Sequence, residues 1–282
     1  MSKRQSSLML VVSFAISGTI LFQMGLYVIS MLAGWNVKFN LVAVCHSWLK
    51  AFGLSFLEYV LDGLVIYTLL FLLWKIGLQL IQTTRMKKRF QQYKGEKLTI
   101  EMSQAFGIGK EELSVLSHPT PMAFTMGFVS PKIIVTTGLI NLLNHDELRA
   151  VISHEMYHKE NRDPLKVFLL SLSSSIMWYI PIQKWFHHKY SVIQEILADD
   201  FAIKQQETSV NLGNALLKML KVGKQEKMPF TYVSFANTSL NHRIEYILNP
   251  LKEVQLQLPF KIALISLLIF SLICGLFIYA LA

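Results

Sequence analysis

Three residues in the run Ala-Val-Ile-Ser-His-Glu-Met-Tyr-His-Lys-Glu have the types and spacing that metal-dependent hydrolysis needs. Side chains four positions apart lie on one face of a helix, so His154 and His158 can direct imidazole nitrogens at one ion. Glu155 follows the first histidine and can act as general base toward a metal-activated water. Asn144 and Glu147 have the spacing of a capping box, which independently predicts a helix start. The pattern therefore predicts a metal-dependent hydrolytic site on one helix.

An apolar stripe and a clear end complete this predicted helix. Leu148, Val151 and Ile152 supply the stripe, and the run Asn-Arg-Asp-Pro ends it at residues 161–164. Asp163 stands before a proline, where it suits the cap of the next helix. We therefore expect Asp163 to lie near the site and to support it.

A third ligand is predicted further along the chain. Glu195 can complete a zinc site of two histidines and one glutamate, which leaves a fourth position for water. Asp199 lies one helical turn later and can accept the free ring N–H of a ligand histidine. Alone, such a pair is more typical of a solvated acidic helix face. Together with the histidine pattern, it predicts one Zn²⁺ ion per chain.

Residues 119–139, 146–163 and 195–199 together resemble the peptidase domain of the BlaR/MecR-type membrane metallopeptidases. They are also similar to the HtpX and CAAX-prenyl-protease families, which share the H-E-x-x-H and E-x-x-A-D patterns. The stretch Gly-Phe-Val-Ser-Pro-Lys-Ile-Ile-Val favours the BlaR type. The resemblance covers roughly residues 99–248 and implies a zinc metalloendopeptidase of the gluzincin kind. Nothing after the last apolar segment matches a penicillin-binding sensor domain, so β-lactam sensing is not expected from these residues.

Three basic residues are weaker candidates for contact with the substrate or with the oxyanion of the reaction. His187 and His188 lie in an aromatic cluster, for which a membrane-interface role is the favoured interpretation. Arg243 belongs to a run, residues 239–248, that resembles a late segment of the same peptidase families. We favour a structural ion pair for Arg243 over contact with the oxyanion.

The composition points to a membrane protein. Of 282 residues, 52% are hydrophobic and only 16% are charged, which is too apolar for an ordinary soluble protein. The net charge is +9, but the basic residues stand beside apolar runs instead of forming one face with interleaved aromatic residues. We therefore expect contact with a lipid bilayer and none with nucleic acid.

The first 92 residues are predicted to anchor the chain. Apolar runs at about 8–33 and 56–81 are long enough to cross a bilayer. The segment 34–55 between them carries charges and suits an interfacial amphipathic helix. A cleavable signal peptide is disfavoured because the first apolar run is too long for a signal core. Basic residues at 3–4 and 85–89 predict that both flanking ends are cytoplasmic.

Residues 93–255 are predicted to form a peptidase domain on the cytoplasmic face. A short helix is expected at 98–106 and a β-hairpin at 122–128 and 132–137. In the resembling families, an edge strand at this place pairs with extended substrate. A hairpin that only covers the active-site helix is an equally good interpretation.

Residues 167–182 are apolar, yet one full crossing there would separate Glu195 from the two histidines. We therefore predict a hydrophobic helix packed on the domain, or a re-entrant hairpin. Residues 256–282 are predicted to be a C-terminal transmembrane helix.

These patterns together predict a mainly α membrane protein with an α+β peptidase domain that holds a small β-hairpin. The predicted function is zinc-dependent hydrolysis of peptide bonds in a protein or peptide substrate, in the cell membrane. Regulated cleavage of a cytoplasmic repressor and HtpX-like quality control of membrane proteins both stay open. A zinc-binding regulatory protein with weak turnover is the alternative from another class, and a transporter is disfavoured because the crossings show no repeat.

Overall fold

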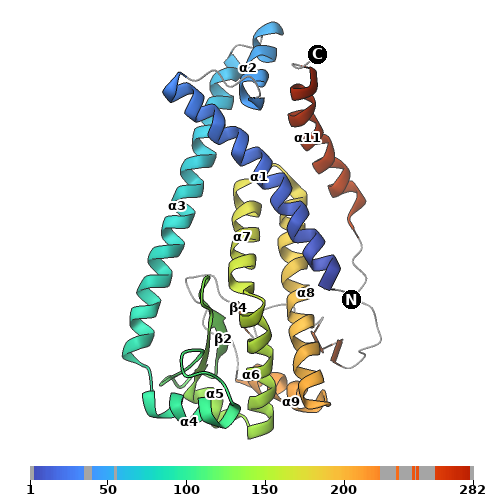
Figure 1. The fold of residues 1–282 in the computed structure, drawn as a ribbon. Coiled ribbons are helices and arrows are strands. Elements are labelled where there is room, and N and C mark those ends of the chain that lie inside the picture. Colours follow the sequence, from blue (N-terminus) through green and yellow to red (C-terminus); the bar gives the residue numbers. More distant parts are fainter. Residues whose placement is uncertain are drawn as a thin grey trace. The chain divides into compact units, whose positions relative to one another are not determined.

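The computed structural model describes residues 3–34, 40–53, 56–222, 233–234, 243–244, 246–247 and 258–279. These residues are mostly helical and include one small sheet (Figure 1). The chain divides into two compact units. The sheet unit comprises Met1–Ser6, Gln79–Leu169 and His188–Gln255, and the helical unit comprises Ser7–Leu78, Leu170–His187 and Leu256–Ala282.

The helix with the histidine pattern is α6 (His145–Glu160), and its predicted capping box is confirmed. The Glu147 backbone N–H donates to Asn144 Oδ1 at 2.8 Å, and the Asn144 N–H donates to Glu147 Oε2 at 2.9 Å. Two backbone donors at the helix start are thereby satisfied without help from distant residues. Local sequence accordingly sets where α6 begins, and this in turn sets which of its side chains face inward.

The sheet contains β1 (Leu113–Leu116), β2 (Ala123–Met126), β3 (Lys132–Thr136) and β4 (Val233–Ser234) in the order β1-β3-β2-β4. The predicted hairpin is confirmed, because β2 and β3 pair antiparallel. β1 runs parallel to β3, and β4 runs antiparallel to β2. Neither β1 nor β4 was predicted from the sequence. Because β4 occupies the second side of β2, the expectation that β2 is an edge strand is wrong over Phe124–Thr125.

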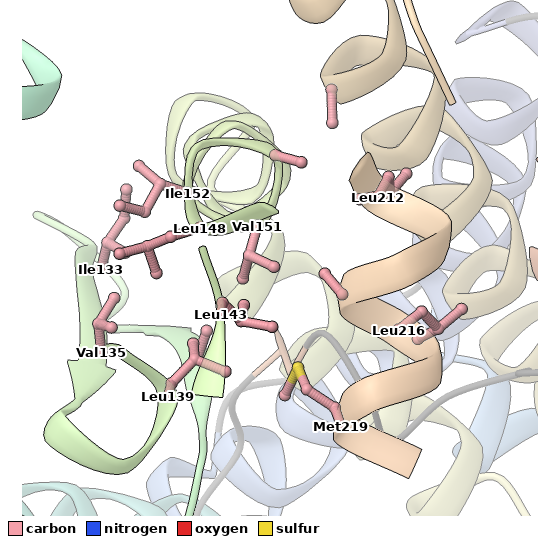
Figure 2. Close-up of a cluster of buried hydrophobic side chains, with 14 of the residues drawn as sticks. Ile133, Val135, Leu139, Leu143, Leu148, Val151, Ile152, Leu212, Leu216 and Met219 are labelled. Atoms are coloured by element: carbon pink, nitrogen blue, oxygen red, sulfur yellow. The ribbon is translucent and has the colours of Figure 1, made fainter. Parts of the chain in front are cut away.

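The two faces of the sheet bury different partners, as the alternation of strand side chains requires. Ile133 and Val135 face α6, and the cluster continues to α9 (Val210–Lys221) (Figure 2). Phe124 and Ile134 point the other way and pack with Met86 near the end of α3. The sheet thus lies between α6 on one face and the last turns of α3 on the other.

Two predicted helices of the sheet unit are confirmed. α9 buries the predicted stripe, and its four residues are at most 1% exposed: Leu212, Ala215, Leu216 and Met219. α4 (Glu96–Phe106) ends at Gly107, whose φ of 67° is a left-handed conformation that favours glycine. The short α5 (Thr137–Leu142) was not predicted, and it joins β3 to α6.

The apolar stretch 167–182 is not one helix, so that form of the prediction is wrong. α7 (Asp163–Ile176) ends before a turn at 177–180, and α8 (Pro181–Gln206) begins immediately after it. Proline lacks a backbone N–H and cannot continue a helix, but it suits a first helical position. The chain therefore reverses at this turn, as the alternative prediction of a hairpin requires (Figure 1).

Two described helices are long and apolar enough to cross a membrane: α1 (Lys3–Ala33) and the Asp62–Gln92 part of α3 (Phe56–Gln92). α11 (Phe260–Tyr279) has 20 residues and is apolar along Phe260–Ser271. α2 (Leu41–Ala51) has 11 residues and is about 16 Å long, too short to cross. Its length suits the predicted interfacial segment.

Candidate metal centre

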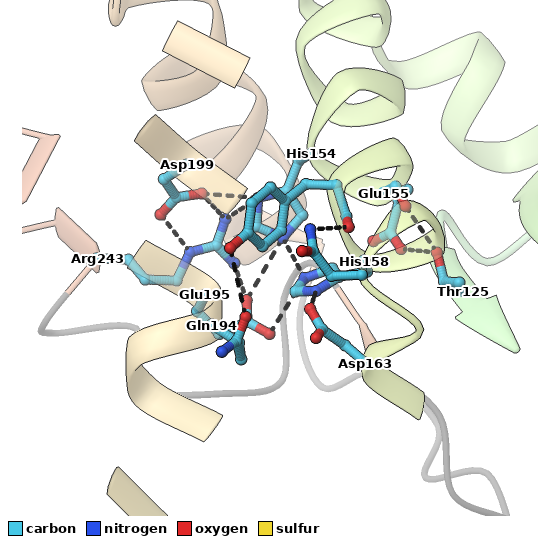
Figure 3. Close-up of polar contacts among 11 residues, drawn as sticks. Thr125, His154, Glu155, His158, Asp163, Gln194, Glu195, Asp199 and Arg243 are labelled. Atoms are coloured by element: carbon cyan, nitrogen blue, oxygen red, sulfur yellow. Dashed lines mark hydrogen bonds and ion pairs between the residues drawn. The ribbon is translucent and has the colours of Figure 1, made fainter. Parts of the chain in front are cut away.

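The two histidines of α6 converge on one point inside the sheet unit. His154 and His158 are both fully buried, and their Nε2 atoms lie 3.1 Å apart (Figure 3). Because they are four residues apart, the helix brings one imidazole above the other. The rings meet edge to face, with centroids 4.8 Å apart. Both Nε2 atoms are therefore available to a single ion.

A carboxylate from α8 reaches the same point. Glu195 Oε2 lies 3.5 Å from His154 Nε2, and Glu195 Oε1 lies 3.6 Å from His158 Nε2. One donor atom from each of the three residues lies within 4.8 Å of the others. A tetrahedral zinc ion with bonds of about 2.0–2.1 Å places its ligand atoms roughly 3.3 Å apart. The observed spacing is close to that value.

Both histidines are oriented by a second carboxylate at the other ring nitrogen. His154 Nδ1 lies 2.8 Å from Asp199 Oδ1, and His158 Nδ1 lies 2.8 Å from Asp163 Oδ2. When Nδ1–H donates to a carboxylate, Nε2 keeps its lone pair for a metal. Asp163 is the first residue of α7, so it reaches back to the helix that precedes it.

Arg243 joins two of these carboxylates from the far end of the chain. Its Nε donates to Asp199 Oδ2 at 2.8 Å and its Nη2 to Asp199 Oδ1 at 2.6 Å, a two-point contact. Its Nη1 lies 3.1 Å from Glu195 Oε2, without hydrogen-bond geometry. The guanidinium is fully buried. These contacts support the structural ion pair over the oxyanion role.

Glu155 lies beside the histidines and is also fully buried. The Thr125 hydroxyl on β2 lies 2.8 Å from Glu155 Oε2 and 3.0 Å from the Glu155 carbonyl oxygen (Figure 3). Sequence analysis did not single out Thr125. The available signal was its place in the predicted strand, where alternation directs Ala123 and Thr125 toward the same face.

Within the described residues, three buried carboxylate oxygens of the site have no hydrogen-bond partner: Glu155 Oε1, Asp163 Oδ1 and Glu195 Oε2. Of these, Glu195 Oε2 faces the Arg243 guanidinium and Asp163 Oδ1 lies 3.9 Å from Lys166 Nζ. A buried carboxylate oxygen is costly unless a donor or a cation faces it. Imidazole nitrogen and carboxylate oxygen are the donor types that zinc accepts. The residues of this structure therefore fit a zinc ion held by His154, His158 and Glu195.

Negative charge dominates the electrostatics of the centre. Burial raises the pKa of Glu155, against the opposing effect of the histidines and the Thr125 hydroxyl. Burial alone would lower the pKa of His158, but the bond to Asp163 and the charge of Glu195 raise it to about 9. Burial would raise the pKa of Asp199, yet the Arg243 charge holds it below its usual value. The same negative charge that raises the pKa of His158 also attracts a metal cation to the site.

Comparison with known sequences agrees with this geometry. The sequence profile of the family described as BlaR1 peptidase M56 matches residues 58–247, more than half of the chain. The chain belongs to the BlaR1 peptidase M56 family. The predicted resemblance to BlaR-type and HtpX-type peptidases is thereby confirmed, and the chain is a member of a membrane metallopeptidase family.

This M56-family chain has relatives among both the BlaR-type and the HtpX-type proteins. The regulatory protein BlaR1 of Bacillus licheniformis is 24% identical over 249 residues, which cover 79% of this chain and 40% of that protein. The protease HtpX homolog of Caldanaerobacter subterraneus subsp. tengcongensis is 39% identical over 80 residues, or 27% of this chain and 26% of the relative. The HtpX homolog of Thermococcus sibiricus is 42% identical over 67 residues, 23% of each chain. The chain thus spans less than half the length of each of these relatives.

His187 and His188, the two other candidates for contact with the substrate or the oxyanion, are not part of the metal centre of this M56-family chain. His188 is exposed on α8, two helical turns before Glu195, and among the described residues it forms no hydrogen bond or ion pair with the residues of the site. His187 is half-buried and belongs to the helical unit. Neither position supports the weak prediction of an oxyanion or substrate contact.

Proposed function

We propose that this M56-family chain is an integral membrane zinc metalloendopeptidase that hydrolyses peptide bonds in a protein substrate. The observation that carries the proposal is the convergence of His154, His158 and Glu195 within 4.8 Å, beside the buried carboxylate of Glu155. Membership of the family supports peptide-bond chemistry, and the donor set supports zinc.

In this proposal, His154 Nε2, His158 Nε2 and one oxygen of Glu195 hold the metal. Asp199 and Asp163 keep the two imidazoles in the tautomer that leaves Nε2 free, and Arg243 fixes Asp199. Zinc, when bound, supplies a Lewis acid that lowers the pKa of a water ligand to about 7 and polarises the scissile carbonyl.

Glu155 is the proposed general base. Thr125 holds its Oε2, so its Oε1 is the oxygen that takes the proton of the attacking water. The water oxygen bonds to the carbonyl carbon as that proton moves to Glu155. The same proton then passes to the leaving amine nitrogen as the C–N bond breaks, which returns Glu155 to its ionised form.

The proposed placement in the cell membrane follows from the apolar helices. We propose that α1, α3 and α11 cross the bilayer within segments 1–92 and 256–282, and that residues 93–255 form the peptidase domain on the cytoplasmic face. The basic residues at 85–89 of α3 and at 3–4 of α1 support cytoplasmic placement of both helix ends, including the N-terminus. The α7–α8 turn supports this arrangement, because it returns the chain to the unit that holds His154.

The proposed biological role is regulated proteolysis of a cytoplasmic or membrane protein, such as a repressor. The relative named regulatory protein BlaR1 supports it, and it aligns over most of this chain. Quality control of membrane proteins is the second candidate, which the relatives named protease HtpX support over shorter segments. A zinc-binding regulator without useful turnover is the remaining alternative.

Metal content tests the proposed ligands directly. Detergent-purified full-length chain is expected to hold about one zinc per chain, measured by plasma mass spectrometry, and to cleave a casein-type substrate. His158→Ala and Glu195→Ala are expected to lose both the zinc and the cleavage, because each removes one of three protein ligands. Lys204→Ala, which alters an exposed ion pair on α8, is the matched control and should keep both.

Two results would decide against parts of this proposal. Zinc that survives Glu195→Ala in a folded chain would remove Glu195 from the ligand set. Zinc at full occupancy in the wild-type chain, with no cleavage of any protein or peptide offered, would favour the regulatory protein without turnover.

Thr125 offers a separate test of how the base is positioned. Thr125→Val keeps the side-chain shape but removes the hydroxyl that holds Glu155 Oε2. Because a hydrogen bond to a charged group contributes about 1.5–3 kcal/mol, we expect kcat to fall by roughly 10- to 100-fold. KM and zinc content should not change, and Thr125→Ser should restore most of the rate in the same casein cleavage assay. A variant that loses stability and KM alike, with no rescue by serine, would mean that Thr125 only supports the fold.

A further inference from the structure

A cavity of about 300 Å³ lies in the sheet unit, on the face of the sheet opposite α6. Its floor is apolar and comes from three strands and one helix: Leu116 of β1, Met126 of β2, Ile134 of β3 and Phe90 of α3. The side chains that face the candidate metal centre point to the other side of the sheet. This cavity is therefore separate from the residues of the candidate metal centre.

The rim of the cavity is cationic. Lys87 of α3, Lys94 and Lys132 of β3 line it together with serine hydroxyls. Glu111 is the acid near this rim, and it pairs with Lys132 at 2.9 Å, but its side chain is 91% exposed. Such an exposed pair is weak and easily replaced. Within the described residues, Lys87 and Lys94 form no ion pair, and the charge of Lys94 acts together with that of Lys132 on Glu111. Three lysines thus share one exposed carboxylate, so positive charge is left over at the rim.

A ligand that fits this cavity needs an apolar part to cover the floor and a negative charge to face the lysines of the rim. We propose that this cavity binds a phosphate-bearing ligand with an apolar part, whose phosphate lies among Lys87, Lys94 and Lys132. Lysine is a common phosphate partner because its ammonium is a compact charge with three donors. The apolar part would cover Phe90 and Met126, which a simple inorganic anion would leave in contact with water.

Two sources can supply this chemistry: the headgroup of an anionic phospholipid and a soluble phosphorylated metabolite. The sequence around the cavity favours the lipid. Lys87 follows the apolar stretch of α3 by six residues, which is about 9 Å along the helix. That distance is close to the depth of the headgroup layer, where basic residues after a crossing attract anionic lipids.

The cavity also contacts the strand that positions the proposed base. Met126 follows Thr125 directly on β2, and the two side chains point to opposite faces of the sheet. A ligand bound at this cavity therefore touches the strand that carries Thr125, although binding itself does not depend on peptidase activity.

The test uses native mass spectrometry of the full-length chain in detergent, with dioleoyl phosphatidylglycerol against dioleoyl phosphatidylcholine as probes. The cavity variant combines Lys87→Gln, Lys94→Gln and Lys132→Gln. The matched control combines Lys88→Gln, Arg89→Gln and Lys97→Gln, which remove the same charge from exposed positions of the same segment that do not line the cavity. Calorimetric titration with phenyl phosphate, a soluble phosphate monoester with an apolar group, tests the soluble source.

We expect wild type to bind phosphatidylglycerol in preference to phosphatidylcholine, with about a tenfold or greater loss in the cavity variant and less than about a twofold loss in the control. Binding of phenyl phosphate that only the cavity variant loses would also support the site, and would assign the soluble source. Equal losses in the two variants would overturn the proposal. So would equal binding of the anionic and the zwitterionic lipid together with no binding of the soluble phosphate. The thermal unfolding curve of each variant, followed by circular dichroism, shows that the chain is folded whether or not it binds zinc. This result is therefore separate from the outcome of the zinc and peptidase tests.

Discussion

Glu155→Gln is expected to lower kcat for peptide-bond hydrolysis by about 10²- to 10⁴-fold while zinc stays bound. Glutamine keeps the size of the side chain, and its carbonyl oxygen can still accept from Thr125. It cannot take a proton from water at neutral pH, so the step in which the oxygen attacks the carbonyl carbon loses its base. Because Glu155 is fully buried with one oxygen unpartnered, removing its charge should leave the chain at least as stable.

The measurement pairs single-turnover cleavage of a casein-type substrate with zinc content and unfolding temperature of the same preparation. Glu155→Asp is the control that keeps the carboxylate but shortens the side chain by one methylene. It should retain more activity than glutamine if proton transfer is what matters. Full cleavage by Glu155→Gln with zinc in place would show that another group is the base.

Arg243→Met is expected to destabilise the chain by about 3–5 kcal/mol, on the order of 10 °C in unfolding temperature. The guanidinium is fully buried and pairs with Asp199 and Glu195, so its loss leaves two buried carboxylates without their cation. The Arg243 charge also helps hold the pKa of Asp199 low, so that pKa should rise in the variant. A protonated Asp199 is a poorer acceptor for His154, and zinc affinity should fall with it.

The variant Arg243→Lys tests whether the positive charge alone is enough or whether the two-point contact with Asp199 is also needed. Lysine keeps the positive charge but cannot make the two-point contact with Asp199, so an intermediate loss of stability is expected. Thermal unfolding with and without added zinc measures both effects, since a bound ion should recover part of the loss. Wild-type stability and zinc content in Arg243→Met would mean that the ion pairs at 2.6 and 3.1 Å do not support the centre.

Much of the local structure could be predicted from sequence because its causes are local. The capping box of α6 joins residues three apart, and the i, i+4 spacing of His154 and His158 follows from helix geometry alone. The β2–β3 hairpin and the glycine end of α4 depend on neighbouring residues as well. Short strands lack such signals, which is why β1 and the two-residue β4 were not predicted.

The apolar stretch 167–182 is continuous in hydrophobicity but contains the end of one helix and the start of the next. Its hydrophobicity predicted a helix, while Pro181 marked the true start of α8. Hydrophobicity indicates burial and not whether a helix is continuous, so the sequence left a single helix and a hairpin as open alternatives until the turn at 177–180 was seen.

The sequence by itself determined the face of α6 that carries the two histidines, the position of Glu155 next to His154 and the existence of the long apolar helices. Only the tertiary structure decided which carboxylate orients which histidine, that Thr125 holds Glu155 and that Arg243 bridges Asp199 and Glu195. The partners in these last two contacts are 30 and 44 or more residues apart in the chain. Local propensity carries no information about such contacts, because the packing of the sheet against α6 and the side-chain contacts of α8 with its histidines set them.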